Sequence, residues 1–355
     1  MGKFEIIDIK DTIRWDHIVK SFRQNDIYYF NKYVRAFQIH GDGEPILIYY
    51  QAEDLRGFNV TMKRDISLFD PLKKSFPVAT YFDIITPYGY GGFIFEGNVN
   101  DENLVCFNND YLEILNNEHI ICEFVRYHPL LDNAKNMCSV STVLKLGKTI
   151  SIDLESIDLI WTNITSKNRN MIRKAQKSGI IIQHGKSNEL MNEFIRIYNS
   201  TMEKDNASNY YYFHKMFYKS IQSDLDGNYE LFYAVYDNKI ISMSIMLFTN
   251  ERMHYHLSGS DFEYRNLAPT NLLLYEAACW GCNQGYRTLH LGGGIGSNED
   301  NLFKFKQAFN RNSYNSFFIG KQIYNQKVYD DLVEIREINN LGFNKESSFF
   351  PLYRA

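Results

Sequence analysis

The sequence has 355 residues, of which 45% are hydrophobic and 23% charged, so its composition is that of a globular protein and excludes a disordered one. Its length exceeds what one hydrophobic core usually serves, and we therefore expect two domains. The net charge of −4 excludes a general attraction to nucleic acid, so any such contact requires a local basic patch.

Membrane insertion and metal binding have no clear sequence signal. No run of 18 apolar residues is present and the N-terminal residues lack the apolar core of a signal peptide, so we predict no transmembrane segment and a cytoplasmic location. The five cysteines are an odd number and are predicted to be free thiols. Cys279 and Cys282 have C-x-x-C spacing, but no second pair stands at zinc spacing, so no metal site is expected.

The first half of the chain alternates short apolar runs with turns. A stretch rich in glycine and tyrosine, residues 86–92, follows one of these runs and contains Tyr88 and Tyr90, which are candidate substrate-binding residues. Such a mixture of strands and helices indicates an α+β or mixed α/β architecture. We predict strands at 46–51, 58–62, 81–85 and 120–127, and a helix at 109–116.

A basic helix is predicted over residues 167–178, between Ser166 and the helix-ending Gly179. It carries five cations and no acid, and its cations include Lys167, Arg169, Arg173 and Lys177. Like charges four residues apart on a helix repel each other by about 0.2–0.5 kcal/mol per pair. A helix that tolerates this repulsion suits the phosphates of a nucleotide or an RNA backbone. A solvated helix that pairs with acids elsewhere is the alternative.

A second polar cluster follows the basic helix. Lys204 stands before Asp205 and is a candidate phosphate ligand, and Tyr211 belongs to a run of aromatic residues that suits a substrate cleft. Half-buried packing of these tyrosines is the alternative.

The second half begins with a predicted three-stranded meander. Asp237-Asn238 and Thr249-Asn250 are suitable hairpin turns between its strands. We predict strands at 230–236, 240–248, 252–259 and 286–291, helices at 271–284 and 300–309, and a final strand pair within 313–324.

A glycine-rich turn and a lysine close this half. Gly293 and Gly294 follow an apolar strand, where the absence of Cβ atoms allows a close approach of backbone and ligand. Lys306 lies in the next helix between Phe305 and Phe309, and is well placed to meet a developing oxyanion. The alternative is an ordinary amphipathic helix with a solvated lysine.

Taken together, these segments resemble the FemABX family of peptidyl transferases, relatives of the GNAT acyltransferases. The resemblance implies two tandem GNAT-like domains, each a mostly antiparallel mixed sheet flanked by helices, which we place at 1–150 and 151–355. The ordered motifs that carry the resemblance are DIYYFNKY at 26–33, PYGYGG at 87–92, RYHPL at 126–130, the basic helix 167–179, YHLSGS at 255–260, HLGGG at 290–294, Phe305-Lys306 with Phe309, and IGKQI at 319–323.

Members of this family transfer an aminoacyl group, usually from aminoacyl-tRNA, to an amine of a cell-wall precursor. The resemblance therefore implies an aminoacyltransferase of cell-wall, peptidoglycan or surface-polysaccharide biogenesis, with a nucleotide- or lipid-linked glycan precursor as acceptor and peripheral association with a membrane-bound precursor as an option. Phe305 and Lys306 match the catalytic pair of the family. Lys204 replaces an arginine that binds phosphate there, which weakens the bidentate contact. His256 is a candidate substrate ligand, and the proton of the acceptor amine could be removed by the substrate itself, by His256 or by Asp300.

The sequence leaves two donors open. GNAT enzymes that use acyl-CoA hold its pyrophosphate with the loop [Q/R]-x-x-G-x-[G/A], and the matching residues here are 265–270, RNLAPT. Pro269 removes one N–H donor and Thr270 adds bulk. Arg265 and Asn271, at the two ends of this region, remain candidate phosphate ligands.

We therefore expect aminoacyl-tRNA as the donor and no bound cofactor. A first alternative is an acyl-CoA-dependent N-acyltransferase acting on a nucleotide-sugar or glycan precursor. A second alternative is a non-catalytic GNAT-fold protein whose cleft only binds such a precursor or a partner protein.

Overall fold

A computed structural model describes residues 2–73, 75–340 and 342–355 of the chain. The fold is mixed α/β and comprises two compact units. Unit 1 contains residues 1–146 and 317–355, and unit 2 contains residues 147–316.

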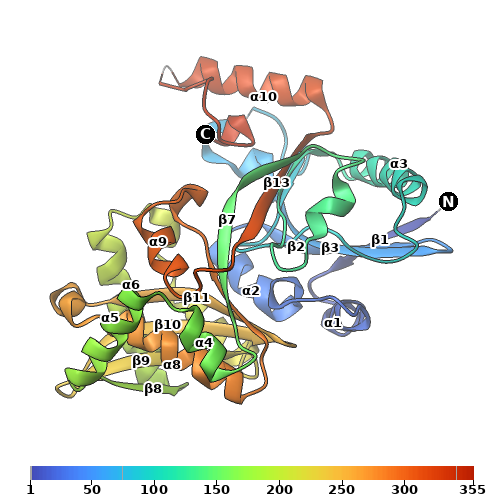
Figure 1. Ribbon diagram of the computed structural model, residues 1–355. Helices are drawn as coiled ribbons and strands as arrows, with labels where there is room; N and C mark the ends of the chain where they lie inside the picture. The colour runs from blue at the N-terminus through green and yellow to red at the C-terminus, as the bar shows by residue number, and fades with distance from the viewer. Residues whose placement is uncertain (1, 74, 341) are drawn as a thin grey trace. The chain divides into compact units, whose positions relative to one another are not determined.

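Unit 1 is built on a mixed sheet with the strand order β1-β2-β3-β4-β6-β13, in which β5 also pairs with β3. All pairs are antiparallel except β4 and β6. The long helix α3 covers one face of this sheet, and α1 and α2 cover the other (Figure 1). The elements are β1 Lys3–Asp8, α1 Thr12–Ser21, α2 Asn31–His40, β2 Glu44–Gln51, β3 Leu55–Asp65, β4 Phe82–Ile85, β5 Ile94–Gly97, α3 Asp101–Asn117, β6 Ile120–Arg126, β13 Asn315–Ile323 and α10 Gln326–Asn339.

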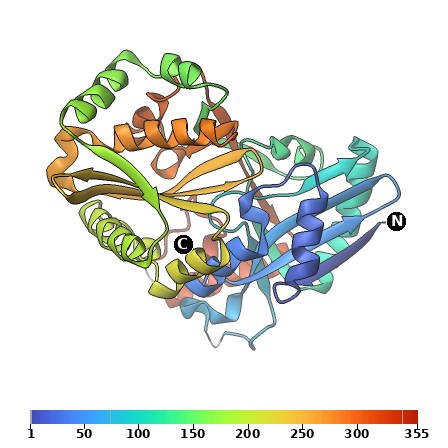
Figure 2. The same cartoon turned by 90° about the horizontal axis from the view of Figure 1, so that it is seen from below.

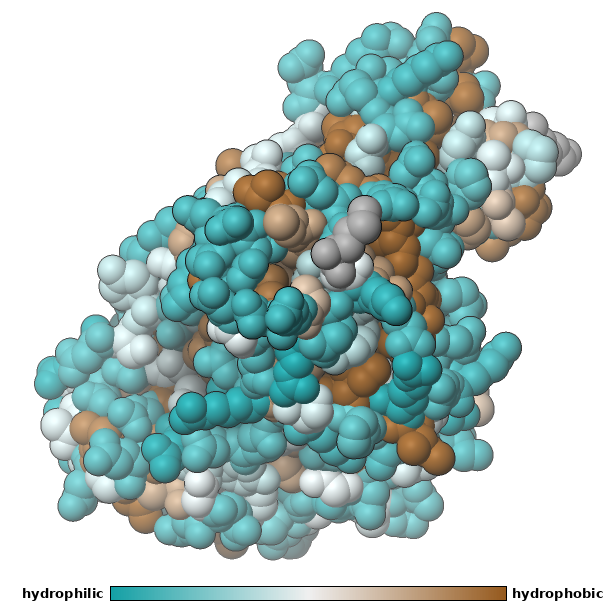
Figure 3. Space-filling view, turned by 90° about the vertical axis from the view of Figure 1, so that its right-hand side faces the viewer, coloured by the Kyte–Doolittle hydropathy of each residue, from teal (hydrophilic) through white to brown (hydrophobic). Residues whose placement is uncertain are grey.

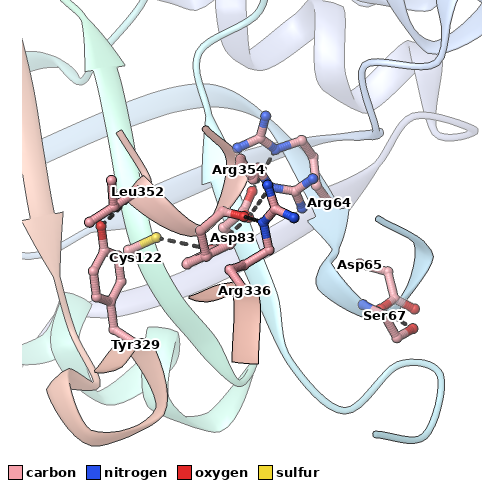
Figure 4. Close-up of polar contacts among 10 residues, drawn as sticks. Arg64, Asp65, Ser67, Asp83, Cys122, Tyr329, Arg336, Leu352 and Arg354 are labelled. Carbon is pink, nitrogen blue, oxygen red and sulfur yellow. Dashed lines mark hydrogen bonds and ion pairs between the residues drawn. The ribbon is translucent and has the colours of Figure 1, made fainter. Parts of the chain in front are cut away.

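The C-terminal segment belongs to unit 1, whereas the sequence predicted a continuous second domain at 151–355. A buried polar cluster explains this difference (Figure 4). Asp83 in β4 accepts hydrogen bonds from Tyr353 Oη at 2.7 Å and Arg354 Nε at 2.6 Å. Burial alone would raise the pKa of Asp83, but Arg64 and Arg354 lower it below its usual range. The tail is therefore fixed to β4 by charge-assisted bonds.

Unit 2 repeats this plan with the strand order β7-β12-β11-β10-β9-β8, in which only β11 and β12 are parallel. Helix α8 lies on one face of the sheet and α6 on the other (Figure 2). The elements are β7 Val143–Asp153, α4 Ile157–Asn163, α5 Ser166–Lys177, β8 Ile181–Gly185, α6 Asn188–Lys204, α7 Lys215–Asp224, β9 Tyr229–Tyr236, β10 Lys239–Thr249, β11 Arg252–Ser260, α8 Pro269–Asn283, β12 Thr288–Gly292 and α9 Asn301–Gln307.

Three local features position the strands and helices of unit 2. At Gly259 a Cβ atom would lie 2.8 Å from the Cα atom of Tyr198, so glycine allows the backbone of α6 to pack directly on β11. Apolar residues of α5 and α8, among them Ile172 and Leu273, share one buried core with β9 and β10. Helix α5 starts at a Thr165 cap, which accepts a hydrogen bond from the Asn168 amide.

Two of the predicted elements differ from the structure by more than a few residues at their ends. The predicted helix 109–116 begins at Asp101, because Asn100 caps it and its first turn is acidic. The predicted strand pair in 313–324 is one strand, β13, which pairs with β6 of unit 1.

The surface in Figure 3 is covered mainly by hydrophilic residues, with smaller groups of hydrophobic residues between them. Among the described helices, none has the length and apolar character required to cross a membrane.

Candidate functional site

The parallel strands β11 and β12 stop pairing near the C-terminal end of β12, and the candidate site lies at this point. Their pairing ends at His254 and His290, whose rings lie 5.7 Å apart between centroids, although β11 continues to Ser260. On the other edge of β11, Leu257 faces Ile245 and Tyr255 faces Met246, so His256 is the extra residue of a β-bulge. Bulges of this kind redirect side chains and are common next to active sites.

Lys306 lies beside the end of β12. It projects from α9, is only 8% exposed, and donates a hydrogen bond from Nζ to the carbonyl oxygen of Gly293 at 2.6 Å. Phe305 on α9 and Phe309, two residues beyond the end of α9, lie in edge-to-face contact with ring centroids 5.5 Å apart. Burial lowers the pKa of Lys306 to about 8, and the negative charge of Asp300 partly opposes this shift. At pH 7 the buried amine is therefore still mainly an ammonium ion.

In the glycine turn after β12, backbone atoms of the same chain fill the space next to Gly293 and Gly294. A Cβ atom at Gly293 would lie 2.8 Å from the carbonyl oxygen of Lys148, and one at Gly294 would lie 2.1 Å from that of Asn298. The structure therefore explains these two glycines by backbone packing, and their predicted contact with substrate stays a prediction.

Two side chains near this turn are candidate bases. Burial, together with the neighbouring His254, lowers the pKa of His256 to about 3, so it is neutral at pH 7 but binds a proton weakly. Asp300 caps α9 through the Phe303 amide at 2.8 Å, and that bond and others to backbone amides hold the pKa of Asp300 below its usual range. Both groups are therefore weak bases, since an efficient base has a pKa near the working pH.

The residue before α8 has an unusual backbone conformation. Ala268 adopts a left-handed conformation with φ of 57°, the region that glycine favours, and Pro269 occupies the first helical position. Thr270 Oγ1 lies 3.0 Å from Ser242 Oγ.

The N-terminal ends of α5 and α8 meet at one hydrogen bond. Asn271 Nδ2 donates to Asn168 Oδ1 at 2.7 Å. Asn168 is 2% exposed, and its Nδ2 has no hydrogen-bond partner among the residues that the structure describes. Helix N-termini favour anions, so this junction combines two positive helix ends with a buried donor.

Two predicted phosphate ligands are brought together at Phe262. The ring of Phe262 contacts both Lys204, with Nζ 4.0 Å from its centroid, and Arg265, with Cζ at 3.8 Å. Lys204 remains 49% exposed at its side chain. The pair therefore presents two positive charges next to the end of β11.

The cations of α5 do not all face solvent. Arg169 donates hydrogen bonds to the carbonyl oxygens of Trp161, Thr162 and Ile164 and thereby caps the end of α4. Arg173 lies over the Trp161 ring at 5.1 Å but is exposed, as are Lys167 and Lys177. The last three are the members of the predicted row that remain available to a phosphate.

The three tyrosines predicted to bind substrate, Tyr88, Tyr90 and Tyr211, have separate packing partners. Tyr88 stacks on Phe37 at 5.3 Å, and Tyr90 makes edge contacts with Tyr28 at 5.5 Å, all within unit 1. Tyr211 is an exposed residue of unit 2 that contacts Tyr210. Their roles in substrate binding stay predictions.

Three residues of this region were missed in the sequence analysis, namely Asn168, His254 and His290. The histidines lie opposite each other only because β11 and β12 pair in parallel register. Asn168 is an uncharged polar residue between two cations in the first turn of α5, and this was the one sequence feature that could have pointed to its contact with α8.

Comparisons with known proteins agree with this fold. Residues 165–306 match the acetyltransferase (GNAT) domain family. A crystal structure of FemX superposes with a TM-score of 0.66 at 15% identity, covering 92% of this chain and 99% of FemX. The chain has a FemABX-like GNAT fold.

Two further structures are similar to this chain in fold. The C-terminal domain of a proposed lysylphosphatidylglycerol synthetase from Agrobacterium fabrum has a TM-score of 0.56 at 14% identity, covering 91% of this chain and 96% of that domain. A conserved protein of unknown function from Bacteroides thetaiotaomicron has a TM-score of 0.57 at 12% identity, covering 90% and 99% of the two chains. No curated protein sequence matches the chain.

Proposed function

We propose that this chain is an acyltransferase that moves an aminoacyl group from aminoacyl-tRNA to an amine of a cell-wall or surface-glycan precursor. The observation that carries the proposal is the buried ammonium group of Lys306, held by the Gly293 carbonyl beside the separation of β11 and β12. A buried positive charge stabilises a developing oxyanion more strongly than an exposed one.

The proposed reaction needs few protein groups. The neutral acceptor amine attacks the carbonyl carbon of the aminoacyl ester, and Lys306 offsets the negative charge on the tetrahedral oxygen. The attack forms the C–N bond, and collapse of the tetrahedral intermediate restores the carbonyl and breaks the ester C–O bond. The tRNA hydroxyl leaves with a proton, and the acceptor nitrogen loses one. Because the ester is activated and the amine is a good nucleophile, no nucleophilic residue of the protein is required.

The basic surface of unit 2 supports an RNA donor. Three features lie on segments in or next to the loop 265–270. They are the exposed cations on α5, the two cations that contact Phe262, and the hydrogen bond that joins the N-termini of α5 and α8. Phosphate contacts of this sequence-independent kind suit a tRNA backbone. The proposed acceptor is a nucleotide- or lipid-linked precursor in the cytoplasm.

A turnover assay tests the proposal directly. The purified chain is incubated with radiolabelled aminoacyl-tRNAs and a nucleotide-linked glycan-peptide precursor that carries a free amine. The proposal requires transfer of label from tRNA to the precursor, and failure with every aminoacyl-tRNA would refute it.

We expect the transfer rate to fall by about tenfold between pH 7 and pH 9. The pKa of Lys306 is lowered to about 8 by burial, so its ammonium form, and with it the oxyanion stabilisation, is lost as pH rises through that value. The rate is measured with an acceptor that is already neutral at pH 7, such as hydroxylamine. In Lys306→Arg the guanidinium stays charged, so any remaining activity should be flat over this range. A wild-type profile that is equally flat would contradict the role of the ammonium ion.

The exposed cations of α5 give a second prediction. Arg173→Gln with Lys177→Gln should weaken tRNA binding by about tenfold or more at low salt, and should reduce the slope of log K against log[salt] by about 2. Filter binding between about 50 and 200 mM salt measures both. Lys215→Gln with Lys219→Gln, on the exposed side of α7, is the matched control. An unchanged slope in the α5 variant would exclude α5 as a phosphate contact.

Acyl-CoA-dependent N-acylation is the second candidate function. It is favoured by the match of residues 165–306 to an acetyltransferase domain family and by the left-handed Ala268 before α8. The acceptor would again be a nucleotide-sugar or glycan amine.

A further inference from the structure

Unit 1 contains an unusual buried carboxylate, Glu123, at the centre of a cavity. Glu123 lies in β6 and is 6% exposed. The cavity has a volume of about 60 Å³ and is enclosed by α3, β3, β6, β13 and the segment 137–142. Leu112 and Thr142 also line it and are themselves exposed, so the cavity reaches the surface of the unit.

The hydrogen bonds of Glu123 do not neutralise its charge. Oε2 accepts from Tyr324 Oη at 2.6 Å and Tyr111 Oη at 3.3 Å, and Oε1 lies 3.5 Å from Asn59 Nδ2. Burial raises the pKa of Glu123 to about 7, although the two phenols oppose the shift. No side-chain cation pairs with this carboxylate in the described part of unit 1.

A second acceptor in the same cavity lacks a donor. Asn59 is 1% exposed and its Oδ1 has no hydrogen-bond partner among the described residues. Leaving such a buried acceptor unpaired costs about 1–3 kcal/mol. Lys321 also lines the cavity, but its Nζ donates to the Ser348 carbonyl at 2.9 Å. The cavity therefore offers two acceptors to a donor that the chain itself does not supply.

Aromatic rings form much of the remaining wall. Phe93, Tyr111, Tyr127 and Tyr324 line the cavity, and Phe93 and Tyr111 are in edge contact at 5.1 Å. Aromatic faces attract ammonium groups, particularly where water is excluded. Acceptors and aromatic rings together favour a cation with N–H donors over an anion or a neutral apolar ligand.

We propose that this cavity binds a small primary alkylammonium group, with its N–H donors directed to Glu123 and to Asn59 Oδ1. A volume of about 60 Å³ holds roughly four water-sized groups or more, so it accommodates ions up to the size of propylammonium, which has about four non-hydrogen atoms. The binding is independent of the transfer reaction proposed for unit 2.

Calorimetry on the full chain tests this site with methylammonium and propylammonium chloride. We expect saturable binding of at least one of these ions in the millimolar range or tighter. Propanol, which has nearly the same size but no charge, and tetramethylammonium, which has no N–H donor, should bind at least tenfold more weakly. Absence of ammonium binding at about 50 mM would mean that the cavity holds water only, and would overturn the proposal.

Proton release gives a measurement that does not depend on a variant. Glu123 shares the cavity wall with Tyr111 from α3, Tyr127 just after β6, Lys321 from β13 and Tyr324 just after β13. Because its pKa is about 7, a bound cation should ionise it and release about half a proton per ion at pH 7. Titrations in buffers of different ionisation enthalpy measure this release, and binding without it would contradict a contact with Glu123.

The variant Glu123→Gln keeps the shape of the side chain and removes its charge. We expect it to weaken ammonium binding by at least tenfold and to abolish proton release. Glu113→Gln, an exposed position on α3, is the control and should bind like the wild type. Unchanged affinity in a folded Glu123→Gln protein would refute the proposed contact.

Discussion

Replacing Lys306 by methionine should reduce the rate of acyl transfer by about 10²–10³-fold, the usual effect of removing one oxyanion-stabilising group. Methionine keeps an unbranched apolar side chain of similar length, so it should fill the buried position of Lys306. The substitution also removes a charge that burial disfavours, as the lowered pKa of Lys306 shows. We therefore expect a melting temperature within a few degrees of the wild-type value.

The same helix provides the control for this prediction. Lys304 lies two residues earlier and is exposed, so Lys304→Met makes the same chemical change in solvent and should retain full activity. Single-turnover assays separate the chemical step from donor binding. A folded Lys306→Met protein with a wild-type rate would remove Lys306 from the mechanism. Unfolding of this variant would show that the lysine is structural.

The sequence predicted those parts of the fold that depend on local signals. The hairpin between β9 and β10 is an example, since Asp237 and Asn238 both adopt positive φ angles, as the turn residues indicated. The order of α5, β9, β10, β11, α8, β12 and α9 in unit 2 was also correct. The helices α1, α2, α4, α6, α7 and α10 were missed, and so was the return of residues 317–355 to unit 1. That return depends on the pairing of β13 with β6 and on the bonds to Asp83, which have no local signature.

The candidate site shows the same division between local and distant contacts. Lys306 could be named as a candidate from the sequence, because its aromatic neighbours and the preceding glycines lie close to it in the chain. The Asn168–Asn271 bond joins residues 103 positions apart, and the Glu123 cavity is lined by several separate segments. Such sites exist only after the chain has folded, so residue spacing could not reveal them. Conversely, Arg169 belonged to a regular row of cations, but the structure uses it to cap α4.

Acetyl-CoA should bind this chain poorly, with a Kd of about 0.1 mM or weaker, whereas aminoacyl-tRNA should support turnover. In the structure Ala268, the residue before α8, adopts the left-handed conformation that glycine favours. Pro269 nevertheless removes one backbone donor, and Thr270 places a branched side chain at the next position. A lost charge-assisted hydrogen bond costs about 1.5–3 kcal/mol, which weakens a micromolar ligand by roughly 10- to 150-fold.

Calorimetry with acetyl-CoA and desulfo-CoA measures this difference directly. The double variant Pro269→Ala with Thr270→Ala restores the missing N–H and removes the branched side chain, so its affinity for both ligands should rise by about tenfold or more. Pro269 is the first residue of α8, where alanine is also a good helix former, and the variant should therefore fold normally. Micromolar binding of acetyl-CoA by the wild type would contradict the argument from the loop, because the pyrophosphate would then need neither the absent N–H nor the space that Thr270 fills. It would also reverse the order of the two proposed functions and make an acyl-CoA the donor.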